Sequence, residues 1–180
     1  RDGNALRRVM LSNMPGSAIV AVRIDGVMHE FQTIDGVVED VTSIILNLKG
    51  VVIKNNSEDV KTLTIDVDEE RVVTAADIKG DADVEIVNPD HVIATLSKGG
   101  KLSVELIVAN GRGYVQANDN KKYIENQKVG FIPIDSNFSP IERISYEVES
   151  ARVGQDANFD KLIMYVTTDG SLRPEESIAL

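Results

Sequence analysis

Residues 39–50, with the sequence EDVTSIILNLKG, contain the clearest helix signal in the chain. Their large apolar residues recur at helical spacing and share one face: Val41, Ile44, Ile45 and Leu48. Acidic residues at the start and Lys49 in the last turn suit the helix dipole, and Gly50 is typical of a left-handed stop. The segment predicts an amphipathic helix over residues 39–49.

Strand patterns lie on both sides of this helix. Residues 17–24 have a period of two that places one set of residues on one face: Ala18, Val20, Val22 and Ile24. Asp25 and Gly26 then predict a tight hairpin whose partner strand is residues 27–32, with His29 in mid-strand. Further strands are predicted over residues 61–67, 83–87, 91–96 and 102–108, with a turn at 97–101. Residues 118–128 are polar and predict an exposed loop.

The two ends of the chain return to helical patterns. Residues 4–13 predict a helix that Pro15 and Gly16 end. Residues 141–148 and 161–167 predict two long strands, and a further helix begins near Pro174. The whole pattern predicts the α+β class, with helices near the ends and a middle that consists almost entirely of strands.

Composition narrows the classes of function. The chain has 180 residues, 42% of them hydrophobic, and a net charge of −10. This acidic balance argues against a nucleic-acid binder, because affinity for the phosphate backbone comes mainly from Lys and Arg. The absence of cysteine excludes disulfides and thiolate metal sites. No apolar run or leader pattern predicts a membrane segment or secretion, so we expect a cytoplasmic setting.

Catalytic motifs are scarce. His29 and His91 have neither HxxxH nor HExxH spacing, and no GxSxG elbow occurs. Acidic residues around Asp81 and Asp83 lack the pattern of a calcium loop and are typical of a solvated rim. The glycines of residues 111–113 predict a turn or bulge. The residues alone therefore favour a non-catalytic interaction domain, with no catalytic residue, metal or cofactor.

Several blocks resemble the amino-terminal domain of the bacterial DNA-directed RNA polymerase alpha subunit. They span almost the whole chain in the order of that family: GNALRRVMLS (3–12), MPG (14–16), IDGVMHEF (24–31), EDV (39–41), ILNLKG (45–50), VTAADI (73–78), DVEI (83–86), GRGY (111–114), SPIER (139–143) and DKL (160–162). The resemblance implies a scaffold that forms a homodimer and docks the β and β′ subunits. It also implies no catalytic residue of its own within the nucleotidyltransferase complex.

The family resemblance also implies a domain organisation. Residues 1–15 and 140–180 correspond to a discontinuous dimerisation domain of helices and antiparallel strands, and residues 16–139 to a β-rich insert. The chain corresponds to a fragment, truncated at both ends and without the DNA-binding carboxy-terminal domain. We therefore expect no direct DNA binding and no membrane partner.

The same resemblance implies three sets of contact residues. The dimer set is Leu6, Val9 and Met10. The set that contacts the β subunit is Arg8, Leu11, His29, Glu30 and Phe31. The set that contacts β′ is Lys49, Ile134, Asp135 and Ser139. Two alternatives remain open: a metal-dependent enzyme that uses the acidic middle with His91, and a generic acidic adaptor.

Overall fold

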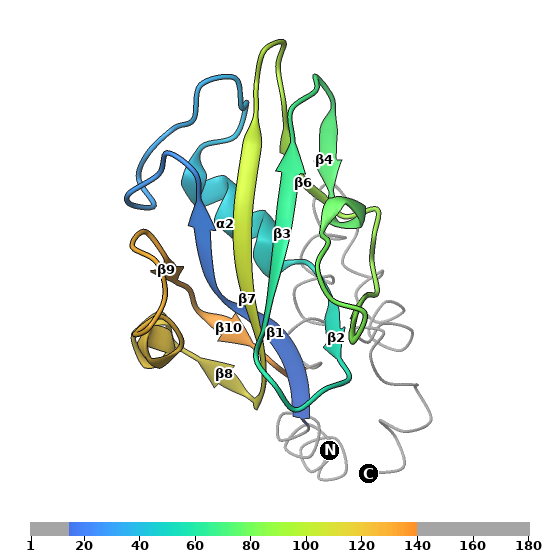
Figure 1. The fold of residues 1–180 in the computed structure, drawn as a ribbon, viewed down its shortest axis with the longest axis vertical. Coiled ribbons are helices and arrows are strands. Elements are labelled where there is room, and N and C mark those ends of the chain that lie inside the picture. The colour runs from blue at the N-terminus through green and yellow to red at the C-terminus, as the bar shows by residue number, and fades with distance from the viewer. Residues whose placement is uncertain (1–14, 140–180) are drawn as a thin grey trace, which may run out of the picture.

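The structure is a computed structural model that describes residues 15–139. Residues 1–14 and 140–180 lie outside the described part, drawn in grey in Figure 1. The predicted helix over residues 4–13, the strands over 141–148 and 161–167 and the helix near Pro174 all fall there. The same is true of both predicted dimerisation segments, apart from the first residue of β1.

A four-stranded antiparallel sheet forms the centre of the described part (Figure 1). Its strand order is β3 (Lys61–Val67), β7 (Leu102–Arg112), β1 (Pro15–Ile24) and β9 (Ile132–Pro133). The long pair β1 and β7 runs from Pro15 opposite Arg112 to Ile24 opposite Val104. The predicted strands over 17–24, 61–67 and 102–108 are confirmed, and the last extends to Arg112.

One face of the sheet is covered by helix α2 (Val41–Lys49). The alternating residues Leu63, Ile65 and Val67 of β3 belong to this core, as do the inward residues of β7. The apolar face of α2 packs against them: Val41, Ile44, Ile45 and Leu48 are all buried. The predicted face of the helix is therefore confirmed.

Short ribbons extend this layer. β2 (Ile53–Asn55) pairs with β5 (Val84–Ile86), and β4 (Val72–Thr74) pairs with β6 (Val92–Thr95). A 3-10 turn η1 (Ala75–Asp77) follows β4. The predicted strands over residues 83–87 and 91–96 thus form as β5 and β6, and each belongs to a different ribbon.

The opposite face of the sheet has a smaller core. It is covered by η2 (Ala117–Tyr123) and by the pair β8 (Tyr114–Val115) and β10 (Ser136–Asn137). The prediction of an exposed loop over 118–128 is wrong at Asn120, which is 1% exposed. Its side-chain amide donates to the Ile134 carbonyl at 2.8 Å and to Ser136 Oγ at 3.0 Å, so it fixes η2 to the following strands.

The predicted facing of β1 is wrong, because the strand contains a bulge. Its register against β7 shifts between Ile19 and Ala21. An extra residue in one strand reverses the parity of all that follow. Val20 and Ala21 consequently share the smaller core, whereas Ile19, Val22 and Ile24 join the core under α2.

The predicted hairpin after β1 is also wrong. Gly26 has the expected positive φ of 82°, but residues 27–32 form turns instead of a returning strand. Both neighbours of β1 come from elsewhere in the chain, because β7 and β9 pair with it. His29 therefore lies in a loop and not in mid-strand.

Helix α2 differs from its prediction at both ends. It begins at Val41, two residues later than expected, because Asp40 is the N-cap and accepts the Ser43 amide at 2.8 Å. Gly50 has φ −81°, so it is not a left-handed stop. A Cβ there would lie 2.6 Å from the His91 ring, whose Nε2 is 2.7 Å from the Asn47 carbonyl oxygen. A side chain at residue 50 would therefore have to displace this imidazole.

The glycines around residue 111 have two different roles. Gly113 has φ 65°, which confirms a turn glycine. Gly111 lies in β7 opposite Gly16 of β1, and Phe138 lies against both. A Cβ on Gly16 would be 2.3 Å from the Phe138 carbonyl oxygen, and one on Gly111 would be 2.9 Å from its ring. This glycine pair forms a slot for Phe138, which is 2% exposed.

Candidate interaction surfaces

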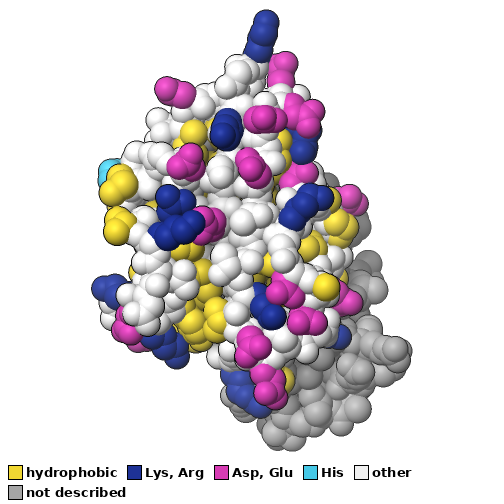
Figure 2. All heavy atoms as spheres, viewed as in Figure 1, with side chains coloured by type: hydrophobic (Ala, Val, Ile, Leu, Met, Phe, Trp, Pro, Cys, Tyr) yellow, Lys and Arg dark blue, Asp and Glu magenta, His cyan; other side chains and the backbone are white. Residues whose placement is uncertain are grey.

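The loop between β1 and α2 exposes four consecutive side chains, Met28, His29, Glu30 and Phe31, here called the loop surface. Met28 is 70% exposed and Phe31 is 79% exposed. Figure 2 shows hydrophobic side chains gathered over this loop, beside a histidine, at the left edge of the molecule. Adjacent exposed large apolar side chains are typical of a protein interaction site.

Gln32 holds this loop in shape. Its side-chain carbonyl accepts hydrogen bonds from the backbone amides of Met28 and His29, the latter at 3.0 Å. The Phe31 amide donates to His29 Nδ1 at 3.1 Å, and the Thr42 hydroxyl donates to the Glu30 carbonyl at 2.7 Å. The loop surface is therefore ordered by its own polar groups and by the first turn of α2.

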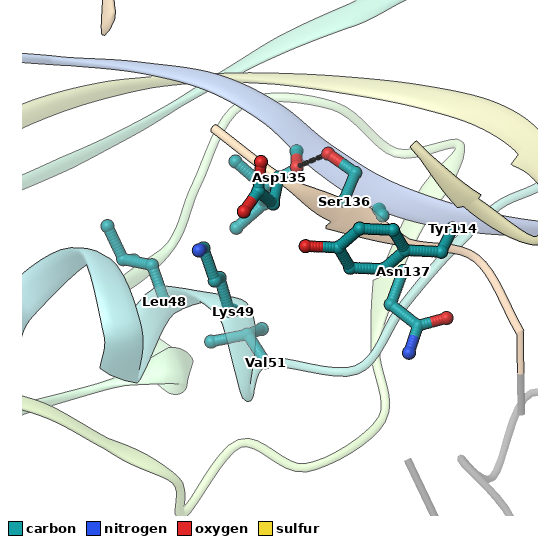
Figure 3. Close-up of a pocket in the computed structure, with 9 residues that line it drawn as sticks. Leu48, Lys49, Val51, Tyr114, Asp135, Ser136 and Asn137 are labelled. Atoms are coloured by element: carbon teal, nitrogen blue, oxygen red, sulfur yellow. Dashed lines mark hydrogen bonds between the residues drawn. The ribbon is translucent and has the colours of Figure 1, made fainter. Parts of the chain in front are cut away.

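A second surface is a cavity of about 140 Å³ at the C-terminal end of α2, here called the Lys49 pocket. It lies where α2, β1, β8 and β10 meet (Figure 3). The lining residues are Ala18, Ile19, Leu48, Lys49, Val51, Tyr114, Asp135, Ser136 and Asn137. The buried Ser136 hydroxyl donates to the Ile19 carbonyl at 2.7 Å, which fixes β10 to β1 at the wall of the pocket.

Three polar groups converge in the Lys49 pocket. In Figure 3 the Lys49 ammonium and the Tyr114 hydroxyl both point toward the Asp135 carboxylate. The pKa of Asp135 is lowered, first by a 2.7 Å hydrogen bond from the Ala117 amide and also by Tyr114 and by the charge of Lys49, while burial opposes the shift. Asp135 is therefore ionised at neutral pH and already holds hydrogen-bond donors.

The predicted β′ set is only partly surface-exposed. Lys49 and Asp135 meet in the pocket, as described. Ile134 is 3% exposed and packs in the core under α2, and Ser139 is 2% exposed. Both side chains are therefore buried, and their contact with a partner stays a prediction.

The predicted β set divides in the same way. His29, Glu30 and Phe31 lie together on the loop surface. Arg8 and Leu11, and the dimer residues Leu6, Val9 and Met10, fall outside residues 15–139. Sequence reasoning missed Met28, Gln32 and Tyr114 as parts of these surfaces. Met28 and Tyr114 lie inside the blocks IDGVMHEF and GRGY, so the signal was present in those blocks.

The acidic middle is organised around a lysine. Lys61 Nζ lies 3.2 Å from Asp81 and 3.6 Å from Asp83, so it occupies the space between the two carboxylates. His91 contacts Asn47 instead of these acids. Within residues 15–139, no group of three or more His, Asp or Glu side chains is arranged to hold a metal ion. Nor does any helix in that range have the length and apolar character needed to cross a membrane.

Comparison with known proteins places the fold. A profile of the family described as "RNA polymerase Rpb3/RpoA insert domain" matches residues 22–139 of this chain. This is well over half of the chain. The chain belongs to this family. Both described surfaces, the loop surface and the Lys49 pocket, lie largely within the matched insert domain.

Two relatives are RNA polymerase alpha subunits by name. The chain is 57% identical over 178 residues to the "DNA-directed RNA polymerase subunit alpha" of Oceanobacillus iheyensis, and the match covers 99% of this chain. It is 54% identical over 177 residues to the protein of that name from Moorella thermoacetica, covering 98% of this chain. In each case the match spans 56% of the relative. The insert-domain chain thus corresponds to about half of each relative.

Proposed function

We propose that this chain acts in transcription as a non-catalytic assembly part of a bacterial DNA-directed RNA polymerase. The single observation that carries the proposal is the insert-domain match over residues 22–139. The two alpha-subunit relatives, matched over 98% or more of this chain, support it. The chain supplies no catalytic residue to the nucleotidyltransferase complex, needs no cofactor and works in the cytoplasm.

The proposed assembly uses three sets of residues. Residues 1–15 and 140–180 form the homodimer, with Leu6, Val9 and Met10 in its apolar centre. Arg8, Leu11 and the loop surface dock the β subunit. The Lys49 pocket docks β′. The two described surfaces support this division, because each is exposed, ordered by internal hydrogen bonds and placed on a different part of the fold.

Two substitutions within residues 1–15 test the roles proposed for Arg8 and Leu6. Arg8→Ala should weaken association with β and leave self-association intact, because an arginine at an interface contributes strongly to binding. Leu6→Asp should instead break the dimer, because an unpaired charge is costly to bury. Light scattering and capture of purified β measure the two effects. Unchanged β binding in Arg8→Ala, or an unchanged mass in Leu6→Asp, would contradict the respective assignment.

The arrangement of the acidic residues does not favour a metal-dependent enzyme. Lys61 lies between the two carboxylates that such an enzyme would use, and His91 is turned toward the end of α2. A cation at that place would have to displace the lysine ammonium. The generic adaptor has no observation that favours it over the polymerase scaffold.

A further inference from the structure

The two charges in the Lys49 pocket differ in how well they are satisfied. Asp135 accepts hydrogen bonds from the Ala117 amide and the Tyr114 hydroxyl. Lys49 is exposed, and within residues 15–139 no carboxylate lies within 4.0 Å of its Nζ. Among the described residues, Lys49 thus has no ion-pair partner within 4.0 Å, whereas Asp135 already accepts two hydrogen bonds.

The size and lining of the pocket suit one side chain. Its volume of about 140 Å³ is close to that of a cavity that holds a benzene-sized molecule. Ala18, Ile19, Leu48 and Val51 give it an apolar lining, and the polar ends of Lys49, Tyr114 and Asp135 point toward one another within it. Such a shape accepts a short aliphatic stem with a polar head.

The charge of that head follows from the pocket. An incoming cation would meet the Lys49 ammonium, a like charge. An incoming carboxylate would meet Lys49 directly. The Ala117 amide and the Tyr114 hydroxyl donate to Asp135 and partly offset its negative charge, whereas no carboxylate of residues 15–139 lies close enough to offset the charge of Lys49. Charge complementarity thus favours an acidic side chain.

We propose that the Lys49 pocket receives one carboxylate side chain, an Asp or Glu of the docking subunit, which forms an ion pair with Lys49 Nζ. This inference rests on the proposed function, since it needs a subunit that docks here. It adds the chemistry of the partner residue. Tyr114 and Asp135 shape the pocket, and Lys49 is the group that the partner recognises.

Zero-length cross-linking tests the proposal directly. In the complex of the complete subunit with β and β′, a carbodiimide should join Lys49 Nζ to a partner carboxylate through an amide, with the reagent taking up the lost water. Mass spectrometry should identify a peptide that links Lys49 to an Asp or Glu of the partner. A complex in which Lys49 cross-links only to Asp135 of its own chain would overturn the proposal.

Charge variants give a second, independent readout. Lys49→Glu should weaken docking by about tenfold or more, whereas Lys49→Arg should retain most of it. Lys98→Glu, the same charge change in the exposed turn between β6 and β7, is the matched control and should bind normally.

The two levels of failure are distinguishable. If the parent complex forms and Lys49→Glu binds as tightly as Lys98→Glu, the carboxylate proposal is wrong while the assembly role stands. If neither the parent nor Lys98→Glu assembles with β and β′, the assembly role itself fails, and the carboxylate proposal fails with it.

Discussion

Phe31 is the exposed phenylalanine of the loop surface, with 79% of its surface accessible. If the loop surface docks β, Phe31→Ser should weaken that association by about 2 kcal/mol, because interface aromatics often dominate binding. Titration of purified β against the complete subunit measures the loss. Val72→Ser is the matched control, because Val72 is 46% exposed on β4, outside the loop surface. Equal binding of β by both variants would contradict the proposal that the loop surface docks β.

Asp77 gives a prediction about acid stability. It forms a two-pronged ion pair with Arg71, with both nitrogen–oxygen distances at 2.9 Å, and accepts the Thr74 amide at 3.0 Å. The Arg71 hydrogen bonds are the largest cause of the lowered pKa of Asp77, the Thr74 amide adds to them, and burial opposes. A carboxyl with a lowered folded pKa stabilises the fold above its unfolded pKa and loses that effect as the pH falls.

Replacing the Asp77 carboxylate should remove this pH-dependent stabilisation. Asp77→Asn should lower the free energy of unfolding at pH 7 by about 1–2 kcal/mol. It should also flatten the loss of stability that the parent chain shows below about pH 4. Urea unfolding at several pH values measures both effects. Asp66→Asn, at an exposed position on β3, serves as the control. A parallel decline with pH in Asp77→Asn and the parent would contradict the role of this pair.

At the scale of elements, the glycine slot of β1 and β7 can be tested by its contacts. Gly111→Ala should destabilise the chain by about 1–3 kcal/mol, because its Cβ would lie 2.9 Å from the Phe138 ring. The same substitution in a Phe138→Leu background should cost less, because the ring is gone. Gly16→Ala should show no such relief, since its clash is with the Phe138 backbone. Equal costs of Gly111→Ala in both backgrounds would contradict the slot.

The hydrophobic pattern predicted an element well where that element buries only one face. The face of α2 and the alternation of β3 could be read directly, because each element buries one side only. β1 could not, because it is buried on both sides and a bulge near Val20 shifts its parity. The packing around Gly50 could not be predicted either, because its neighbour His91 lies more than forty residues away in the sequence.

The candidate surfaces were predictable only in part, for a similar reason. His29, Glu30 and Phe31 are consecutive, so one sequence block contains most of the loop surface. The Lys49 pocket joins residues from four distant elements, and nothing in the local sequence places Tyr114 beside Lys49. Composition and periodicity indicated an interaction domain, whereas the expectation of β and β′ as partners came from the family resemblance alone.

At the scale of the whole molecule, two surfaces on one folded domain suit a scaffold. The loop surface follows β1 and precedes α2, and the Lys49 pocket lies at the other end of α2. One helix thus connects the region proposed to dock β with the region proposed to dock β′. Its buried face fixes the spacing between them, because Val41 and Leu48 are both fully enclosed in the core.

Affinity capture of β and β′ tests the assembly role most directly. The complete subunit that contains this chain is used as bait in a bacterial lysate, with Phe31→Ser and Lys49→Glu baits in parallel. We expect β and β′ to co-purify with the parent in near-stoichiometric amounts. The Phe31→Ser bait should lose mainly β, and the Lys49→Glu bait mainly β′. A folded parent bait that captures neither subunit would contradict the assembly role.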